Sequence, residues 1–585
     1  MRNAKIVCTL GPASRDRATI RALAHAGMAV ARLNASHGSP ADRLDLLERV
    51  REVGSELDRS IAVMLDLKGP EIRTATLPAD ERITYETGDT VRLVPGDDVS
   101  ADHVGLTHSL AGVEAGDEVL LDDGRIELCV ERVDGEEVAT SVDRGGELAS
   151  RKGVNVPGVD LGLEPVTPAD EAELDLAVEQ DVDFVAASFV RDGADVYAVS
   201  EAIENRGGEI PVIAKVERAG AYENLGGIVE AAYGVMVARG DLGVELPMED
   251  VPMIQKRIVR RCREAGVPVI TATEMLDSMV TATRPTRAEA SDVANAVLDG
   301  TDAVMLSAET AVGDHPVRVV ETMDRIIRQV EASGEYQEVL EGRVPAADES
   351  RTDALARSAR YLARDVGAGA IVAATESGYT ARKTAKFRPG IPVVASTPHD
   401  DIQRQLALSW GVQPVFAEVS QQGADAVIEK AVASALGAGV AESGDTVVVL
   451  CGMMTELEGA NTTNMLKVHV AAEALTTGRV VVEGWATGPV SRTTDGDLQD
   501  VPAGVIIALD SSFDGEFDGD LSALSGIIAE RSDMTGYPAM VARELGIPMV
   551  GGVDLDVLEA ADVVTIDAER GVIYDGAVRT QDPSA

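Results

Sequence analysis

Six polar residues between positions 215 and 309 each follow a short apolar segment typical of a buried strand. In a barrel of alternating strands and helices, the residues that follow the strands converge on one mouth, where the active site lies. The pattern therefore predicts an active site built from several neighbouring strands. The six residues are Lys215, Glu217, Asp241, Thr273, Ser307 and Glu309.

Three of these residues could hold a metal ion beside an anionic substrate. Glu217 and Asp241 offer carboxylate oxygens to Mg²⁺ or Mn²⁺, which binds few protein ligands and completes its shell with water and substrate. Lys215 stands two residues before Glu217 on the same predicted strand, so both side chains point to one side. A cation next to a divalent ion suits a highly charged substrate. These residues favour a metal and phosphate site over the alternative, a salt-bridged cluster at the barrel mouth.

A second group of polar residues alternates after the second predicted strand. Arg32, Asn34 and Ser36 share one face by period-two spacing. Arg32 can bind a phosphate or carboxylate group through two parallel hydrogen bonds. Asn34 and Ser36, together with Asp66 from the third strand, offer oxygens to a monovalent cation, or they form a hydrogen-bonded loop. The chain has no Gly-x-x-x-x-Gly-Lys-Ser/Thr motif, which excludes a P-loop nucleotide site.

Eight apolar segments alternate with amphipathic ones and predict an α/β fold with a (β/α)8 barrel. The expected strands are Lys5–Leu10, Val30–Asn34, Ala62–Asp66, Phe184–Ala187, Val212–Lys215, Val235–Ala238, Val269–Thr271 and Ala303–Leu306. The expected helices include Asp16–Ala26, Asp42–Val53, Asp170–Glu179, Glu249–Ala265, Arg287–Leu298 and Val317–Val330.

The barrel pattern is interrupted once and is followed by further domains. Residues 70–157 contain short β-branched segments punctuated by glycine, which predict an all-β domain inserted as a lid between barrel parts 1–69 and 158–335. The acidic stretch Ala332–Glu349 is expected to be a loop. An α/β pattern resumes over residues 350–476, and a Gly-rich, acidic segment over residues 477–585 predicts one more domain.

The charge of the chain is strongly negative. Asp and Glu number 99 against 52 Lys and Arg, nine of which are Lys, for a formal net charge of −47. Repulsion disfavours nucleic acid and anionic membranes as partners. Such a surface suggests adaptation to high salt, which screens repulsion, although an ordinary acidic cytoplasmic protein is the alternative.

Four scattered cysteines and the lack of a long apolar run predict a reduced, cytoplasmic protein without signal peptide or membrane span.

Nine longer strings resemble the pyruvate kinase family, and the resemblance covers about the first 476 residues. It implies transfer of the phosphoryl group of phosphoenolpyruvate to ADP, with a barrel A domain, a lid B domain and a C domain. It also implies a homotetramer. The strings are Lys5–Ser14, Ala31–Gly38, Asp66–Arg73, Lys152–Asn155, Ala238–Gly243, Thr271–Leu276, Pro285–Glu289, Asp292–Val297 and Met305–Thr310.

The resemblance gives roles to the residues of the expected active site. Lys215 would neutralise charge on the phosphoryl group and the enolate, and Arg32 would grip the phosphoryl group. Gly240 and Asp241 would lie at the substrate, and Thr273 would help to deliver a proton to enolpyruvate. Mg²⁺ would be bound by Glu217 and Asp241.

The family's K⁺ and nucleotide sites can also be mapped on this sequence. K⁺ would be bound by Asn34, Ser36, Asp66 and the carbonyl oxygen of Leu67. Glu71 stands where family members that depend on K⁺ have Glu, whereas a Lys accompanies independence from K⁺. The nucleotide-binding residues implied by the resemblance are Asn34, His37, Arg73 and Lys152.

Two further segments resemble known modules. Residues 375–380 are similar to the family's effector loop, whose phosphate contacts would come from Thr375, Ser377, Gly378 and Thr380, although Glu376 and a simple helix cap speak for a structural turn. The tail resembles the swivelling phosphohistidine domain of phosphoenolpyruvate-utilising enzymes. Tyr537 stands where that domain has its phosphorylated His, and no His follows His469, so the tail is expected to be structural or regulatory.

Two other functions remain as alternatives. A metal-dependent barrel lyase or aldolase acting on a pyruvate enolate would share the residues of the mouth, but it has no use for the lid motif Lys68–Arg73 or for Lys152. A catalytically silent scaffold or sensor would be expected to have lost a charged site residue. None is missing among Arg32, Lys215, Glu217 and Asp241.

Overall fold

The computed structural model describes residues 2–77, 81–417, 423–452, 463–472, 474–499, 501–558 and 563–578. The chain forms two units. The first comprises residues 1–347, 385–388 and 399–414, and the second comprises residues 348–384, 389–398 and 415–585.

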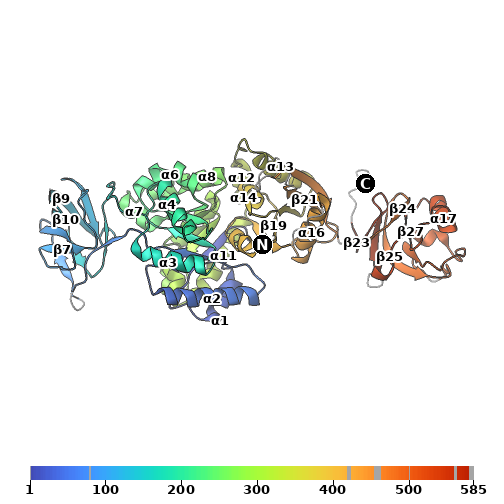
Figure 1. Cartoon of the computed structure of the whole chain (residues 1–585), viewed down its shortest axis with the longest axis horizontal. Helices are drawn as coiled ribbons and strands as arrows, with labels where there is room; N and C mark the ends of the chain where they lie inside the picture. The colour runs from blue at the N-terminus through green and yellow to red at the C-terminus, as the bar shows by residue number, and fades with distance from the viewer. Residues whose placement is uncertain are drawn as a thin grey trace. The chain divides into compact units, whose positions relative to one another are not determined.

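The first unit contains a closed barrel of eight parallel strands, as predicted (Figure 1). Most strand residues are buried, because in such a barrel both faces of the sheet are covered. The α/β fold class is confirmed. In their order around the barrel the strands are β1 (Lys5–Thr9), β2 (Val30–Asn34), β3 (Ala62–Asp66), β13 (Phe184–Ala187), β14 (Val212–Val216), β15 (Gly234–Ala238), β16 (Val269–Ala272) and β17 (Ala303–Leu306).

Helices connect these strands and begin at clear capping signals. Ser39, Thr167 and Thr286 each form a capping box with an acidic residue three positions later. The helices are α1 (Arg17–Ala26), α2 (Pro40–Glu56), α3 (Pro168–Glu179), α4 (Gly193–Glu204), α5 (Ala219–Glu223), α6 (Leu225–Ala231), α7 (Arg239–Glu245), α8 (Val251–Ala265), α9 (Arg287–Asp299), α10 (Ala308–Ala311) and α11 (Pro316–Glu331).

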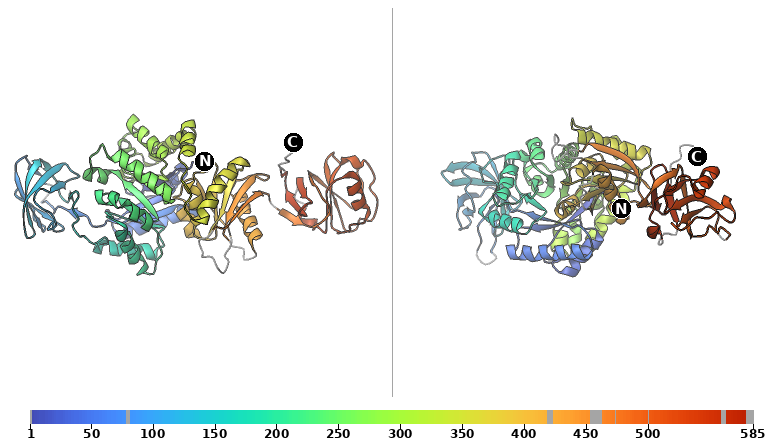
Figure 2. Two further views of the ribbon diagram at one scale, coloured as in Figure 1. Left: turned by 90° about the horizontal axis from the view of Figure 1, so that it is seen from above. Right: turned by 45° about the vertical axis from the view of Figure 1, so that its right-hand side comes forward.

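The insertion is an all-β domain with its own apolar core (Figure 2, light blue). The strands at its two ends pair with each other, Arg73 opposite Gly153, so the chain enters and leaves at one place. Seven strands form one sheet and two form a second. They are β4 (Ile72–Arg73), β5 (Ile83–Tyr85), β6 (Thr90–Pro95), β7 (His103–Leu106), β8 (Glu118–Leu121), β9 (Ile126–Asp134), β10 (Glu137–Arg144), β11 (Gly146–Leu148) and β12 (Gly153–Asn155).

The expectation of a loop over Ala332–Glu349 is wrong, because α12 (Gly334–Gly342) forms inside it. The hydroxyl of Ser333 caps this helix by accepting the backbone N–H of Tyr336 at 3.2 Å. Tyr336 and Leu340 are buried, and the Tyr336 hydroxyl accepts the indole N–H of Trp410 at 3.0 Å. Burial of these two side chains outweighs the acidic composition on which the expectation rested.

The second unit begins with a parallel sheet of β18 (Ala370–Ala374), β19 (Val393–Thr397) and β21 (Thr446–Cys451), extended by antiparallel β22 (Met465–Val470). Helix α16 (Ala424–Gly437) packs on one face and α13 (Arg351–Asp365) on the other.

The tail forms a separate eight-stranded sheet with helix α17 (Tyr537–Leu545) against it, drawn in red (Figure 2). Its first strand pairs with its last, so this sheet starts before residue 477. We propose the other domain limits as the sequence predicts them. The strands are β23 (Ala474–Thr477), β24 (Arg479–Val482), β25 (Trp485–Thr493), β26 (Val505–Leu509), β27 (Leu524–Ala529), β28 (Met549–Gly551), β29 (Val563–Asp567) and β30 (Val572–Asp575).

Two expected absences can be compared with the described residues. None of their helices has the length and apolar character needed to cross a membrane. All four cysteines are free thiols, three of them buried.

A buried carboxylate holds the barrel to two neighbouring arginines. Asp183 stands just before β13 and accepts the backbone N–H of Val63 at 2.6 Å. It also accepts hydrogen bonds from Arg51 at 2.8 Å and Arg404 at 2.7 Å.

We expect Asp183→Ala to lower the free energy of unfolding by about 3–5 kcal/mol, because it leaves two partly buried cations and one backbone donor without their partner. Denaturant unfolding in concentrated KCl measures this. Glu179→Ala, at an exposed position of α3, is the control and should change stability by less than about 0.5 kcal/mol. Equal effects of the two variants would show that Asp183 has no special role.

Candidate active site

Lys215 lies at the centre of a buried charge cluster at the mouth of the barrel. Its ammonium donates to the hydroxyl of Ser188 at 2.7 Å. It also pairs with the carboxylates of Glu217 at 2.9 Å and Asp66 at 3.2 Å. These groups come from the ends of β3, β13 and β14, so the closed barrel brings together residues that are far apart in sequence.

Arg32 is the second cation of the cluster. Its Nε donates to the other carboxylate oxygen of Asp66 at 2.6 Å, and its Nη1 donates to the hydroxyl of Thr9 at 3.0 Å. Asp66 therefore joins Arg32 to Lys215, a contact that the sequence analysis did not predict.

The pKa values in the cluster depend on burial and on these ion pairs. Burial alone would lower the pKa of Lys215, but the charges of Asp66 and Glu217 outweigh it, and the pKa is raised. Burial would raise the pKa of Asp66, but Arg32 and Lys215 lower it. Lys215 and Asp66 are therefore both charged at neutral pH.

Glu217 and Asp241 form the expected carboxylate pair. One oxygen of Glu217 accepts the backbone N–H of Phe189 at 2.6 Å. Asp241 lies in the first turn of α7. Burial, and then the negative charge of Glu217, raise the pKa of Asp241 to about 7.

The donor set of this pair fits Mg²⁺ or Mn²⁺. The buried Glu217 and the half-buried Asp241 repel each other, and a divalent cation would remove that repulsion. The described residues contain no group of three or more His, Cys, Asp or Glu placed to hold a metal ion. An ion here would therefore take its other ligands from water and substrate, as Mg²⁺ does.

Thr273 lies beside this pair in an unusual backbone conformation. Thr273 and Glu274 have φ angles of +67° and +53°, which are rare for residues with side chains. The Thr273 hydroxyl accepts the backbone N–H of Gly240 at 2.9 Å. Arg239 donates to the carbonyl oxygen of Thr273 at 2.6 Å and thereby holds the strained turn in place.

Pockets of about 300–1,000 Å³ are typical for small-molecule ligands, and one of about 690 Å³ opens beside Arg32. Asn34, His37 and Ser307 also line it. The structure thus brings two of the expected nucleotide-binding residues next to the phosphate-binding candidate Arg32.

The other two expected nucleotide-binding residues lie elsewhere. Arg73 is on β4 and Lys152 directly precedes β12, and neither lines this pocket. Arg73 pairs with Glu71 at 2.6 Å, and Lys152 pairs with Asp122 at 2.8 Å.

The expected K⁺ ligands gather at the ends of β2 and β3. The strand register places Asn34 opposite Asp66. The side-chain oxygen of Asn34 accepts the backbone N–H of Ser36 at 3.0 Å. The carbonyl oxygen of Leu67 accepts the hydroxyl of Ser188 at 2.7 Å.

Ser188 is a site residue that the sequence analysis missed. It touches Lys215 and the carbonyl oxygen of Leu67, so it connects the cation cluster to the candidate K⁺ ligands. A signal was present, because Ser188 directly follows a buried strand as the six residues singled out above do. By contrast, Glu309, one of those six, accepts the backbone N–H groups of Leu276 and Ser307 and has a structural role.

The effector-loop candidates lie between β18 and α14 (Tyr379–Lys386). Thr375 donates its backbone N–H to Ser396, and Gly378 has a φ of +74°, as a tight turn requires. The hydroxyl of Thr380 contacts that of Thr463 at 2.8 Å. Ser377 is exposed in the same turn.

Tyr537 begins helix α17 in the tail. Its ring packs against Phe517 with the ring centres 5.7 Å apart, and Phe517 in turn stacks on Phe513. The residue at the position of the missing His is therefore part of an aromatic cluster.

Family models match three parts of the chain. Residues 1–320 match the pyruvate kinase barrel domain, residues 353–469 match the pyruvate kinase alpha/beta domain, and residues 501–571 match the mobile domain of PEP-utilising enzymes.

Individual relatives agree with these matches. The pyruvate kinases of Staphylococcus aureus strains USA300 and NCTC 8325 are each 41% identical over 586 aligned residues, which cover 98% of this chain and 99% of theirs. A crystal structure of a pyruvate kinase from Cryptosporidium parvum is 34% identical with a TM-score of 0.74, and the match covers 80% of this chain and 96% of that one. These comparisons give no support to a lyase or aldolase. The chain belongs to the pyruvate kinase family.

Proposed function

We propose that the barrel mouth transfers the phosphoryl group of phosphoenolpyruvate to ADP, giving pyruvate and ATP. The observation that carries this proposal is the buried pair of cations, Lys215 and Arg32, joined by Asp66. A site with two fixed cations beside a carboxylate pair suits a substrate that carries both a phosphate and a carboxylate.

In this reaction the bond between phosphorus and the enol oxygen breaks, and a bond forms between phosphorus and an oxygen of the ADP β-phosphate. Arg32 binds the phosphoryl oxygens through its guanidinium. Lys215, kept charged by Asp66 and Glu217, stabilises the negative charge that develops on the enolate.

Glu217 and Asp241 would bind Mg²⁺ or Mn²⁺, which supplies divalent positive charge opposite the anionic substrate. The backbone N–H of Gly240, next to Asp241, is held by Thr273. The enolate carbon then takes up a proton to become the methyl group of pyruvate, and the hydroxyl of Thr273 helps to deliver it.

ADP would occupy the pocket beside Arg32, with Asn34 and His37 as contacts. Arg73 and Lys152 would bring positive charge to its phosphates from the lid domain. Closure of a lid in this way would exclude water from the reaction.

K⁺ would be bound by Asn34, Ser36, Asp66 and the carbonyl oxygen of Leu67.

We further propose a homotetramer that works in a salt-rich cytoplasm, where screening reduces the repulsion among the many carboxylates. The turn with Thr375, Ser377, Gly378 and Thr380 would bind a phosphorylated effector, and the tail would have a structural or regulatory role.

The central prediction concerns Lys215. We expect Lys215→Met to lower ADP-dependent pyruvate formation from phosphoenolpyruvate by about 10²–10³-fold or more, because it removes the charge that stabilises the transition state. The control is Lys430→Met in α16, a separate variant that removes the same charge at an exposed position outside the barrel mouth. It should retain normal activity. If Lys215→Met has nearly the activity of the parent and an unchanged unfolding transition, Lys215 does not stabilise the transition state as proposed. Pyruvate formation that does not need ADP would speak against the transfer reaction itself.

Ser188 tests whether the cluster needs an exact orientation of Lys215. We expect Ser188→Ala to lower kcat by about 10–100-fold with little change in KM for phosphoenolpyruvate. The Lys215 ammonium keeps its charge but loses the hydroxyl that accepts its hydrogen bond and fixes its orientation. Steady-state kinetics at fixed Mg²⁺ separate the two constants. Ser200→Ala on α4 is the matched control. A rise in KM alone would assign Ser188 to substrate binding.

The K⁺ site makes a prediction about salts. We expect turnover in KCl to exceed turnover in NaCl by about tenfold, equivalent to about 1.4 kcal/mol in the barrier. Glu71→Lys should bring the two rates together by supplying an ammonium in place of the ion, whereas Glu71→Gln should leave the ratio unchanged. Equal rates of the parent in both salts would rule out the K⁺ requirement.

A further inference from the structure

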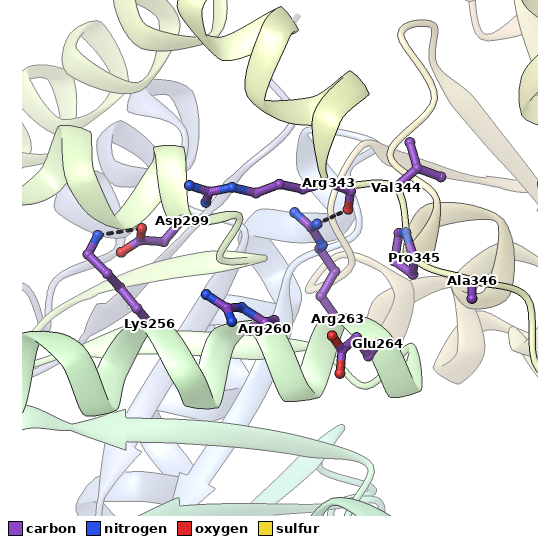
Figure 3. Close-up of a pocket in the computed structure, with 9 residues that line it drawn as sticks. All are labelled: Lys256, Arg260, Arg263, Glu264, Asp299, Arg343, Val344, Pro345 and Ala346. Carbon is purple, nitrogen blue, oxygen red and sulfur yellow. Dashed lines mark hydrogen bonds and ion pairs between the residues drawn. The ribbon is translucent and has the colours of Figure 1, made fainter.

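A second pocket lies away from the barrel mouth and has a cationic lining. Its volume is about 550 Å³, within the range usual for small-molecule sites. It shares no lining residue with the pocket beside Arg32. Figure 3 shows side chains from α8, the end of α9 and the segment after α12 around one space. The lining residues are Lys256, Arg260, Arg263, Glu264, Asp299, Arg343, Val344, Pro345 and Ala346.

The charge of this lining contrasts with that of the chain. Four cations stand against two carboxylates, although the chain as a whole has a net charge of −47. The carboxylate of Asp299 forms an ion pair with the ammonium of Lys256, with Oδ1 and Nζ 2.6 Å apart. In the described part of the chain no ion pair or side-chain hydrogen bond reaches the guanidinium of Arg260 or Arg343, so both are available to a ligand.

Arg263 forms the buried end of this cationic lining. Its residue is 5% exposed, yet its Nε has no hydrogen-bond partner among the described residues. Another of its nitrogens donates to the carbonyl oxygen of Arg343. The Nε atoms of Arg2 and Arg218 are unpaired in the same way, so the cationic lining of the pocket, and not this single atom, indicates a ligand.

The electrostatic surroundings of Arg263 favour a bound anion. Burial, and then the positive charges of Arg388 and Arg343, lower its pKa to about 10. Like charges gathered in this manner are stabilised by a bound anion. Arg260 and Arg263 rise from one helix toward Arg343 in Figure 3, which places three guanidinium groups around the same volume.

We propose that this pocket is a regulatory site for a small organic phosphate, held by Arg260, Arg263 and Arg343. Three guanidinium groups match the several oxygens of a phosphate better than the two of a carboxylate. Val344 and the buried Pro345 supply an apolar wall for the organic part of the ligand.

A chain of hydrogen bonds joins this pocket to the barrel mouth. Asp299, which holds Lys256, accepts a hydrogen bond from Gln255 at 3.5 Å. Gln255 accepts from Arg239 at 3.4 Å, and Arg239 holds the strained turn at Thr273. An anion that draws Lys256 away from Asp299 would loosen this chain, so occupancy of the pocket should change turnover.

Isothermal titration calorimetry tests the binding. The probes are inorganic phosphate and glycerol 3-phosphate, with glycerol as the uncharged control, at constant ionic strength. We expect glycerol 3-phosphate to bind and glycerol not to bind. Arg260→Gln and Arg343→Gln, both at exposed positions where loss of folding is not expected, should each raise Kd by about tenfold or more.

The matched control is Arg261→Gln, which removes the same charge from an exposed position of the same helix outside the pocket. It should change Kd by less than about twofold, which is within ordinary surface effects. Equal weakening by Arg260→Gln and Arg261→Gln would reduce the binding to a general charge effect and overturn the proposal. Binding that survives both pocket variants unchanged would place the phosphate elsewhere, including the barrel mouth or the turn at residues 375–380.

The regulatory part is tested by turnover. Glycerol 3-phosphate should change the rate of the parent enzyme and leave that of Arg260→Gln unaffected. Binding in the pocket without any change in rate would overturn the regulatory role. The result is distinct from failure of the proposed reaction, because calorimetry does not depend on turnover.

Discussion

The mutual neutralisation of buried charges at the barrel mouth is the interaction on which the site depends. Lys215 and Arg32 share Asp66, and Lys215 also pairs with Glu217. Transfer of any one of these groups from water into the barrel would be strongly unfavourable without its partners. The cluster therefore has to assemble as a whole, and the barrel must close for it to exist.

This arrangement also explains how the same charges can serve folding and chemistry. In the protein alone, Asp66 pairs with both cations, and Glu217 pairs with Lys215. An anionic phosphoryl group next to Arg32 and Lys215 would share these cations with Asp66, and a divalent ion would relieve the repulsion between Glu217 and Asp241. Binding of substrate and metal would then exchange one set of ion pairs for another in a site that is already charged and ordered.

The backbone around the cluster is held under strain at the ends of two strands. Phe189 after β13 and Thr273 after β16 both have positive φ angles. Phe189 directs its N–H at Glu217, and Arg239 fixes the carbonyl oxygen of Thr273. Such conformations persist only where surrounding contacts determine them, and they are typical of functional sites. Arg239 belongs to the hydrogen-bond chain that leads to the cationic pocket, which gives that pocket a physical connection to the reaction.

Much of this molecule could be predicted from its sequence. Parallel barrel strands are continuous apolar runs that end in polar residues, so all eight strands and the residues Lys215, Glu217 and Asp241 were visible in order along the chain. Helix α12 was missed because the acidic composition of Ala332–Glu349 indicated a loop, although Tyr336 and Leu340 within it are buried. Ser188 was missed although it obeys the same strand-end rule.

The sequence by itself determined which segments are strands and which ionisable residues stand at their ends, because both follow from local patterns of apolar and polar residues. Only the tertiary structure decided which carboxylate neutralises which cation. That choice depends on strand register and on burial, as in the placement of Asn34 opposite Asp66 and of Lys215 between Asp66 and Glu217. The unpartnered Nε of Arg263 is likewise a property of three-dimensional packing, because a missing hydrogen-bond acceptor leaves no trace in the order of residues.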